Sequence, residues 1–394
     1  MKKVQNVTEK RLRQALQKRI TTLLAVGPMS KNCVDAVIEL AYEHPLPLTL
    51  IASRRQVDAA ELGGGYVNEW TTESFSKYVR KKDPKRKVIL ARDHGGPWQG
   101  THEVKNKMNL SDAMASAKRS YEIDIMSGLD ILHLDPSIDI HHERVSQKVI
   151  IERLFELYEY CMKITHDQGK SVIFEVGTEE QSGKQQTIKG VETFLREIEK
   201  FCLKNKYPKP FFVVVQTGTK VKEMRNIGML GSSVQETKSS AAQKHISKLV
   251  ELCNEFDVHI KEHNTDYLSD EILGWHPRSG IHAANVAPEF GVIETRQLLK
   301  ICDEFGLRKE KEGFLRIAYE SHKWEKWLVE NSTATDYDKA VIAGHYVFSD
   351  PAFSEIKGRI AVRCLSSGFE LDSVLRQAVK HGIRRYMWAF NMLV

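Results

Sequence analysis

The sequence lacks paired cysteines, long apolar runs and a strong excess of one charge. Its six cysteines are scattered along the 394 residues, and none belongs to a Cys-x-x-Cys pair. Such usage is typical of a reducing compartment and offers no disulfide framework. No apolar run reaches the roughly 18 residues needed to span a bilayer, and the basic, polar segment 1–19 lacks the apolar core of a secretory signal. We therefore expect a cytoplasmic protein without a membrane partner.

The charge balance also limits the classes of partner. The formal net charge is +6, and the charged residues are spread along the chain. Nucleic-acid-binding proteins usually concentrate basic residues on one face, often with interleaved aromatic residues. The densest basic run, from Lys81 to Lys87, is interpreted as a solvated loop. A small anionic substrate therefore fits better than nucleic acid.

Eight short apolar runs recur along the first three quarters of the chain. Each has the length of a strand, and none alternates strictly between apolar and polar residues. This pattern is typical of strands that are buried on both faces, as in parallel sheets. The runs are Thr22–Val26, Leu48–Ala52, Val88–Ala91, Ile131–Asp135, Val172–Val176, Phe211–Gln216, Val258–Lys261 and Ile281–Val286.

Amphipathic stretches separate these runs, among them Ser111–Ser127 and Arg144–Gln168. Eight strand–helix alternations predict a (β/α)₈ TIM barrel over residues 1–305. A doubly wound open sheet is the alternative, but no glycine-rich dinucleotide turn follows the first run. Residues 306–394 contain no strand series and are predicted to form a C-terminal helical extension, packed on the barrel or forming an oligomer surface.

Polar residues gather where the predicted strands end. Six of the eight runs end in His, Asp, Glu or Gln residues, or contain them. In barrels of this kind the chemistry lies at the carboxyl ends of the strands. A buried, unpaired charge costs too much to be retained without a partner or a role. We therefore expect the active site at this end of the barrel.

Histidines and carboxylates at these ends suggest a metal site. Two histidines from different strands and a carboxylate can hold a divalent cation with a position open for substrate. His94 and His263 are the best pair, and Glu175, Glu179 and Gln216 are candidate further ligands. A metal at this place would polarise a ketose carbonyl, and a nearby carboxylate would transfer a proton.

The candidate proton-transfer groups are Asp93, beside a predicted ligand, and Glu179, on a loop that could close over the substrate. Asp135 is a further catalytic candidate. His133 lies two residues before Asp135 and shares its face of the strand. For His133, and for His282 near the last run, a functional role and a structural hydrogen-bonding role both stay open.

Several short motifs occur in a specific order between residues 20 and 390. They are Gly64–Tyr66, Asp93–Pro97, His133–Ser137, Gly177–Glu179, Val214–Gly218, Glu262–Tyr267 and Phe348–Asp350. This series resembles the class II, metal-dependent ketose-bisphosphate aldolases. It is most similar to the tagatose-bisphosphate aldolase Z-subunit family, whose members have long been labelled non-catalytic.

The resemblance implies Zn²⁺ as the cofactor and a ketose or ketose phosphate, similar to tagatose or fructose, as the substrate. It implies that His94 and His263 are zinc ligands, that Glu175 lies near the metal and that Asp93 is an acid/base group. Asn285 resembles a residue that contacts substrate. The residues expected to bind substrate are Gly65, Gly96, Asn264, Asp266, His282 and Asn285.

The sequence also departs from the aldolase pattern. Gln216 and Lys220 occupy the region where the aldolases carry a ligand histidine after the sixth strand. Asn264–Asp266 replaces their glycine-rich phosphate loop. The hypothesis thus stays open between a zinc-dependent aldolase and a C4 epimerase that works by retro-aldol cleavage. A non-catalytic subunit that stabilises a separate aldolase is the alternative. A homo-oligomer and an aldolase partner subunit are both possible assemblies.

Overall fold

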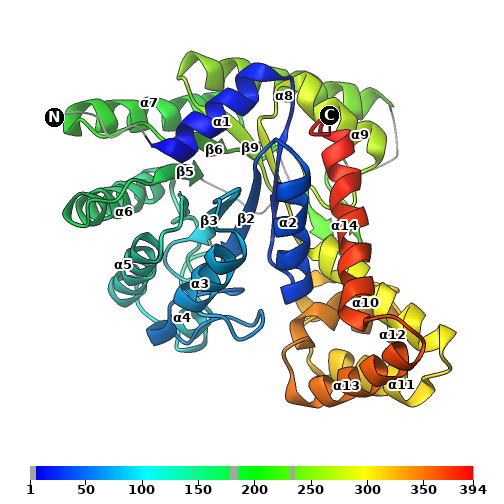
Figure 1. The fold of residues 1–394 in the computed structure, drawn as a ribbon. Coiled ribbons are helices and arrows are strands. Elements are labelled where there is room, and N and C mark those ends of the chain that lie inside the picture. Colours follow the sequence, from blue (N-terminus) through cyan, green and yellow to red (C-terminus); the bar gives the residue numbers. More distant parts are fainter. Residues whose placement is uncertain (1–5, 144, 178–184, 231–235, 394) are drawn as a thin grey trace.

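Eight parallel strands close into a barrel in the order β1-β10-β9-β6-β5-β4-β3-β2. The structure, a computed structural model, describes residues 6–143, 145–177, 185–230 and 236–393 (Figure 1). The barrel strands are β1 Leu23–Val26, β2 Leu48–Ser53, β3 Val88–Gly95, β4 Ile131–Leu134, β5 Ile173–Gly177, β6 Phe212–Val214, β9 His259–Glu262 and β10 Ala283–Val286. The predicted (β/α)₈ barrel is confirmed, and each strand falls on one of the predicted runs.

Burial on both faces of the strands explains the continuous apolar runs. In β1, Leu24 and Val26 join the core between strands and helices, whereas Leu23 and Ala25 join a separate core inside the barrel. Because neighbouring residues of a strand point to opposite faces, both sets must be apolar.

Helices surround the strands as the alternation predicts. They are α2 Lys31–Glu43, α3 Thr72–Lys82, α4 Thr101–Lys105, α5 Leu110–Ser127, α6 Gln147–Asp167, α7 Ile188–Asn205, α8 Glu236–Glu255 and α9 Asp270–Ser279. Helix α1, Val7–Lys18, packs Leu12 and Ala15 against the interior core of the barrel. Among the described helices, none is long and apolar enough to cross a membrane.

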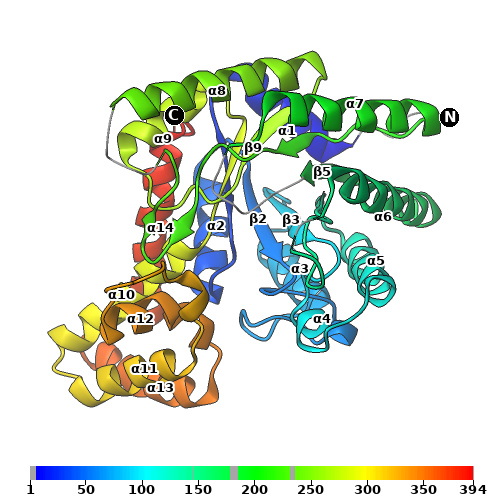
Figure 2. The same ribbon diagram turned by 180° about the vertical axis from the view of Figure 1, so that it is seen from behind.

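The C-terminal region is helical, as predicted. It follows α10, Pro288–Glu304, and contains α11 Arg308–Glu320, η2 Glu325–Trp327, α12 Asp336–Ala343, η3 Gly344–Val347, α13 Pro351–Ser366 and α14 Leu371–Ala389. Figure 1 and Figure 2 show α11, α12 and α13 as a separate group beyond one end of α10, with α14 running back along the barrel.

Two helices connect this group with the barrel. The start of α14 contributes Leu371 and Leu375 to the core of the helical group, and its later residues Val379 and Ile383 join the barrel core. Helix α14 packs against α2, α9 and α10, so the last helix of the chain occupies a place in the ring around the barrel. The division at residue 305 therefore stays an interpretation.

Candidate metal centre

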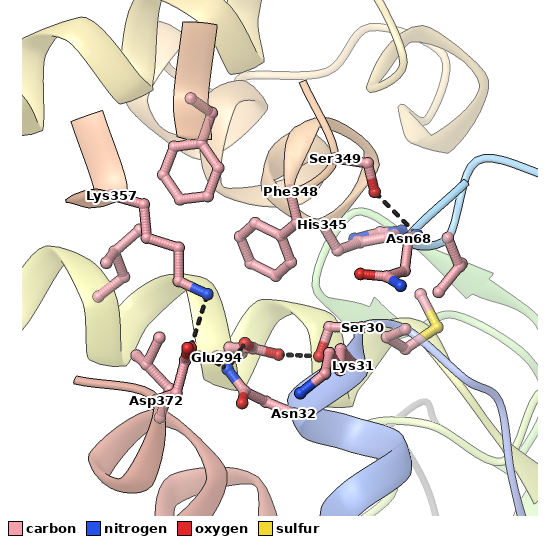
Figure 3. Close-up of a pocket in the computed structure, with 15 residues that line it drawn as sticks. Ser30, Lys31, Asn32, Asn68, Glu294, His345, Phe348, Ser349, Lys357 and Asp372 are labelled. Atoms are coloured by element: carbon pink, nitrogen blue, oxygen red, sulfur yellow. Dashed lines mark hydrogen bonds and ion pairs between the residues drawn. The ribbon is translucent and has the colours of Figure 1, made fainter. Parts of the chain in front are cut away.

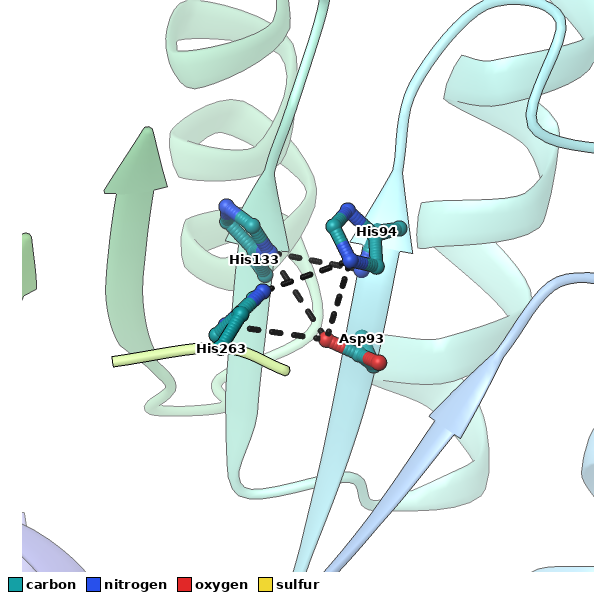
Figure 4. A group of neighbouring side chains, drawn as sticks. All are labelled: Asp93, His94, His133 and His263. Atoms are coloured by element: carbon teal, nitrogen blue, oxygen red, sulfur yellow. Dashed lines mark hydrogen bonds and ion pairs between the residues drawn. The ribbon is translucent and has the colours of Figure 1, made fainter. Parts of the chain in front are cut away.

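One aspartate and three histidines meet at the carboxyl ends of the barrel strands. They are Asp93 and His94 of β3, His133 of β4 and His263, which directly follows β9 (Figure 4). Each offers one potential ligand atom, and these four atoms lie within 4.8 Å of one another. Convergence from three strands of one barrel end is the arrangement that the sequence predicted for an active site.

An irregularity in β3 brings two consecutive residues into the cluster. Successive side chains of a strand ordinarily point to opposite faces. The pairing of β3 with β4 shifts register between Arg92 and Gly95, and His94 has a φ of 43°. This local departure from strand geometry lets both Asp93 and His94 face the cluster.

The donor atoms have the spacing of a compact cation site. His263 Nδ1 lies 3.3 Å from His94 Nε2. Asp93 Oδ1 lies 3.9 Å from His94 Nε2 and 4.0 Å from His133 Nδ1. Metal–ligand bonds of about 2.0–2.2 Å in a tetrahedral zinc site place the ligand atoms about 3.3–3.6 Å apart. Imidazole nitrogens with a carboxylate oxygen suit zinc and similar transition metals, so the residues present fit such a cation.

Two buried carboxylates orient the rings of His94 and His263. Asp135 Oδ2 lies 2.7 Å from His94 Nδ1, and Glu175 Oε1 lies 3.3 Å from His263 Nε2. The other nitrogen of His94, Nε2, faces the cluster and lies 3.3 Å from His263 Nδ1. His263 Nε2 also lies 3.8 Å from Asp93 Oδ1, so both nitrogens of His263 lie beside members of the cluster. A carboxylate behind a histidine in this way fixes its orientation and raises its basicity as a ligand.

The electrostatics of the three carboxylates favour their charged forms. Burial raises the pKa of Asp135, but its hydrogen bond to His94 and the charge of that ring outweigh burial and lower the pKa to about 2. Burial also raises the pKa of Glu175, but the neighbouring Lys261, with Nζ at 2.7 Å from Oε2, acts together with His263 and His133 and lowers the pKa below its ordinary value. Burial likewise raises the pKa of Asp93, but the neighbouring charges, first of His94 and then of His263, lower it below its ordinary value.

His133 is one of the two histidines whose roles the sequence left open. The ring is completely buried, and Nδ1 accepts the backbone N–H of His94 at 3.3 Å. Its Nε2 has no hydrogen-bond partner within the described part of the chain. Burial lowers the pKa of His133 to about 4, so the ring is neutral at physiological pH, which is the form that binds metals. In the sequence, the position of His133 two residues before Asp135 indicates that both side chains lie on the same face of β4.

A cleft of about 480 Å³ lies over the cluster. Asp93, His94, Gln216 and Asn264 line it from the barrel, and Lys326, Trp327 and Tyr346 line it from the helical extension. The predicted ligand Gln216 therefore lines the same cleft as Asp93 and His94. Asn285 Nδ2 donates to Asp93 Oδ1 at 3.1 Å, which places this predicted substrate contact beside the cluster.

Other predicted residues have different positions. His282 precedes β10 and lies at the amino-terminal end of the barrel, where its ring centroid is 4.6 Å from that of His259 and Nδ1 accepts the N–H of Ile260. Its position does not support the expected substrate contact, because a side chain at the start of a parallel strand is at the opposite end from the cluster. Glu179 lies outside the described residues.

Asp266, Gly65 and Gly96, which were predicted to bind substrate, instead contact backbone groups near the site. Asp266 Oδ1 accepts the N–H groups of Ala287 and Glu289 at 3.0 and 2.9 Å, at the start of α10. A Cβ on Gly96, which has a φ of +144°, would lie 2.2 Å from the carbonyl oxygen of Asp135. A Cβ on Gly65 would lie 2.0 Å from the carbonyl oxygen of Gln56. These glycines allow close backbone approach.

A second, smaller cavity of about 80 Å³ lies between α2, α10 and the helical extension (Figure 3). Glu294 accepts hydrogen bonds from Ser30 and from Asn32 Nδ2 there, and Lys357 Nζ lies 2.6 Å from Asp372 Oδ1. These polar groups pair with one another across the junction. We interpret the cavity as part of the packing between barrel and extension.

Fold and site together define a (β/α)₈-barrel protein with a candidate metal centre at the carboxyl ends of its strands. The family model of D-tagatose-1,6-bisphosphate aldolase subunit GatZ/KbaZ-like proteins matches residues 9–291. The chain belongs to this family. No curated protein sequence matches the chain.

Solved structures with the same fold support the barrel assignment. A probable tagatose 6-phosphate kinase from Sinorhizobium meliloti 1021 is similar with a TM-score of 0.74 and 16% identity, covering 93% of this chain and 100% of that one. The fructuronate-tagaturonate epimerase from Cohnella laeviribosi has a TM-score of 0.58 and 9% identity, with 94% and 81% covered. Fructose-bisphosphate aldolase from Campylobacter jejuni has a TM-score of 0.53 and 12% identity, with 98% and 94% covered.

Proposed function

We propose that this protein is a metal-dependent enzyme that breaks and re-forms a C–C bond of a ketose or ketose phosphate by aldol chemistry. The cluster of Asp93, His94, His133 and His263 at the mouth of the barrel is the observation that carries the proposal. Membership of the aldolase-subunit family and the fold shared with aldolases and an epimerase support it.

The three histidines are proposed as the ligands of a divalent cation, most simply Zn²⁺. His133 from β4 would supply the imidazole that Gln216 cannot supply from the end of β6. When bound, the cation would polarise the ketose carbonyl and stabilise the negative charge that develops there during cleavage. Asp135 and Glu175 keep the rings of His94 and His263 in position.

Asp93 is proposed to transfer the proton. Its carboxylate lines the cleft, and Asn285 holds Oδ1 by a hydrogen bond of 3.1 Å. Aldol cleavage requires a base to remove the proton from the hydroxyl group that becomes a carbonyl. An aldolase releases the aldehyde, whereas an epimerase turns it and closes the bond again, and both reactions use this same step. Glu179 remains a proposed further acid/base group.

Metal analysis combined with substitutions tests the proposal. The purified wild-type protein should carry about one divalent metal ion per chain, and His94→Ala, His133→Ala and His263→Ala should each lose most of it. His381→Ala, at an exposed position of α14, is the matched control and should retain the metal. Assays of ketoses and ketose phosphates then separate aldehyde release from C4 epimerisation.

The second candidate function is that of a non-catalytic subunit. The family description itself names an aldolase subunit, and such a protein needs no metal of its own. A folded wild-type protein that stays metal-free after incubation with zinc, and that raises the stability of a separate aldolase, would favour this function over the enzyme.

A further inference from the structure

Four cationic side chains line the cleft above the cluster. Arg55 follows β2, Lys220 and Lys222 belong to the segment around the short hairpin of β7 Val221–Lys222 and β8 Arg225–Asn226, and Lys326 comes from η2 of the helical extension. Among the described residues, the one acidic side chain that lines the cleft with them is Asp93, and its close partners are the three histidines and Asn285 rather than any of the four cations. The neighbouring Arg54 is different, because it is buried and paired with Asp58 and Glu103.

The extension is joined to the hairpin at this cleft. The backbone N–H of Glu223 donates to the carbonyl oxygen of Trp327 at 2.7 Å, and Lys222 Nζ donates to the carbonyl oxygen of Lys326 at 2.7 Å. The carboxylate of Glu223 is engaged by Ser332 Oγ at 2.6 Å and by Arg225 at 3.0 Å. Barrel and extension therefore form one continuous wall of the cleft.

Aromatic rings rather than carboxylates position Lys326. Its Nζ lies 5.0 Å from the ring centroid of Trp327 and 5.2 Å from that of Tyr346, distances at which a cation is attracted to a ring face. Tyr346 in turn accepts a hydrogen bond from Trp327 Nε1 at 3.1 Å. The ammonium group is thus held at the cleft while its charge stays uncompensated by the described residues.

The cations are close enough to repel one another. Partial loss of hydration, followed by repulsion from Arg55, Lys323 and Lys222, lowers the pKa of Lys326 to about 8. Like charges gathered in a cleft raise the local concentration of ligands of the opposite sign. An anion that contacts several of them would relieve their repulsion through charge-assisted hydrogen bonds.

We propose that this wall, made of Arg55, Lys220, Lys222 and Lys326, binds the phosphate group of a ketose phosphate. Four cations favour a phosphate, which carries close to two negative charges, over a carboxylate with one. The identity of the sugar rests on the proposed function, but the binding of the anion does not. The helical extension is thereby a part of the substrate site, since it supplies Lys326.

Calorimetric titration of the full chain with inorganic phosphate tests the proposal directly. Lys326→Met and Arg55→Gln should each weaken phosphate binding about tenfold, which corresponds to the loss of one charge-assisted contact. Lys309→Met, which removes an exposed lysine of α11, is the matched control and should bind as the wild type does. Equal binding by all four proteins would overturn the proposal.

Three sugar probes identify the group that is recognised. Lys326→Met and Arg55→Gln should bind a ketohexose 6-phosphate more weakly than the wild type does. Their affinity for the neutral ketohexose should equal that of the wild type. A loss confined to a ketohexuronate would overturn the assignment to phosphate and indicate a carboxylate. Metal content is measured on the same samples and should not change. A metal-free wild type whose phosphate binding still depends on Lys326 would defeat the proposed function and leave this inference standing.

Discussion

Replacement of Asp266 by asparagine should make the protein more stable at alkaline pH. Asp266 is 2% exposed, and its Oδ1 accepts the N–H groups of Ala287 and Glu289 at the start of α10. Burial, and then repulsion by Glu289, raises the pKa of Asp266 to about 7. In the unfolded chain the pKa is about 3.9, so the folded state disfavours the ionised carboxylate.

The sign and size of the effect follow from this difference in pKa. A group whose pKa is raised by folding contributes stability below its unfolded pKa, and this contribution is lost as pH rises through the folded pKa. About three pKa units at 1.36 kcal/mol each give a loss of up to about 4 kcal/mol above pH 8. Asparagine keeps an oxygen that accepts both N–H groups and does not ionise.

Urea unfolding of the two proteins at pH 5 and pH 8.5 measures this effect. The free energy of unfolding of Asp266→Asn, relative to the wild type, should rise by about 3 kcal/mol between the two pH values. Asp167→Asn, at an exposed position of α6, is the control and should follow the wild type. If the free energies of unfolding of the wild type and of Asp266→Asn change in parallel with pH, folding does not raise the pKa of Asp266.

Three further predictions concern the site and its support. Asp135→Asn should weaken metal binding about 10–100-fold in a chelator competition, because His94 loses its charged partner; unchanged affinity would contradict that role. Arg92→Met leaves the buried carboxylate of Asp124 without its ion-pair partner and should lower the free energy of unfolding by about 3–5 kcal/mol. A loss below about 1 kcal/mol would contradict a stabilising role for this ion pair. A Cβ added by Gly65→Ala would clash with backbone atoms of Gln56 and Val57, so this change should lower the free energy of unfolding by about 1–3 kcal/mol in urea. Gly358→Ala, at an exposed position of α13 with open space around the added Cβ, should raise it by about 0.5–1 kcal/mol.

The strands and their order were predictable from the sequence because both of their faces are buried. A run such as Val88–Ala91 is apolar throughout, and the strand found there is β3, Val88–Gly95. The same logic located Asp93, His94 and His263, since the carboxyl ends of barrel strands converge. The sequence did not show the register shift in β3, which brings Asp93 and His94 to the same site.

Contacts between distant segments could not be predicted in this way. The role of Asp266 depends on α10, which begins 22 positions later, and no local pattern records that contact. The return of α14 to the barrel and the contribution of Lys326 to the cleft join segments that are hundreds of residues apart. His282 differs, because its place before β10 could have indicated the amino-terminal end of the barrel.

Anomalous diffraction at the zinc absorption edge, from crystals of the full chain grown with zinc, shows whether the four side chains at the barrel mouth bind a metal ion. We expect one strong peak per chain between Asp93, His94, His133 and His263, in contact with ring nitrogens of the three histidines. A well-diffracting crystal with no peak at that position, or with zinc bound only at surface residues, would contradict the metal centre and the chemistry proposed from it.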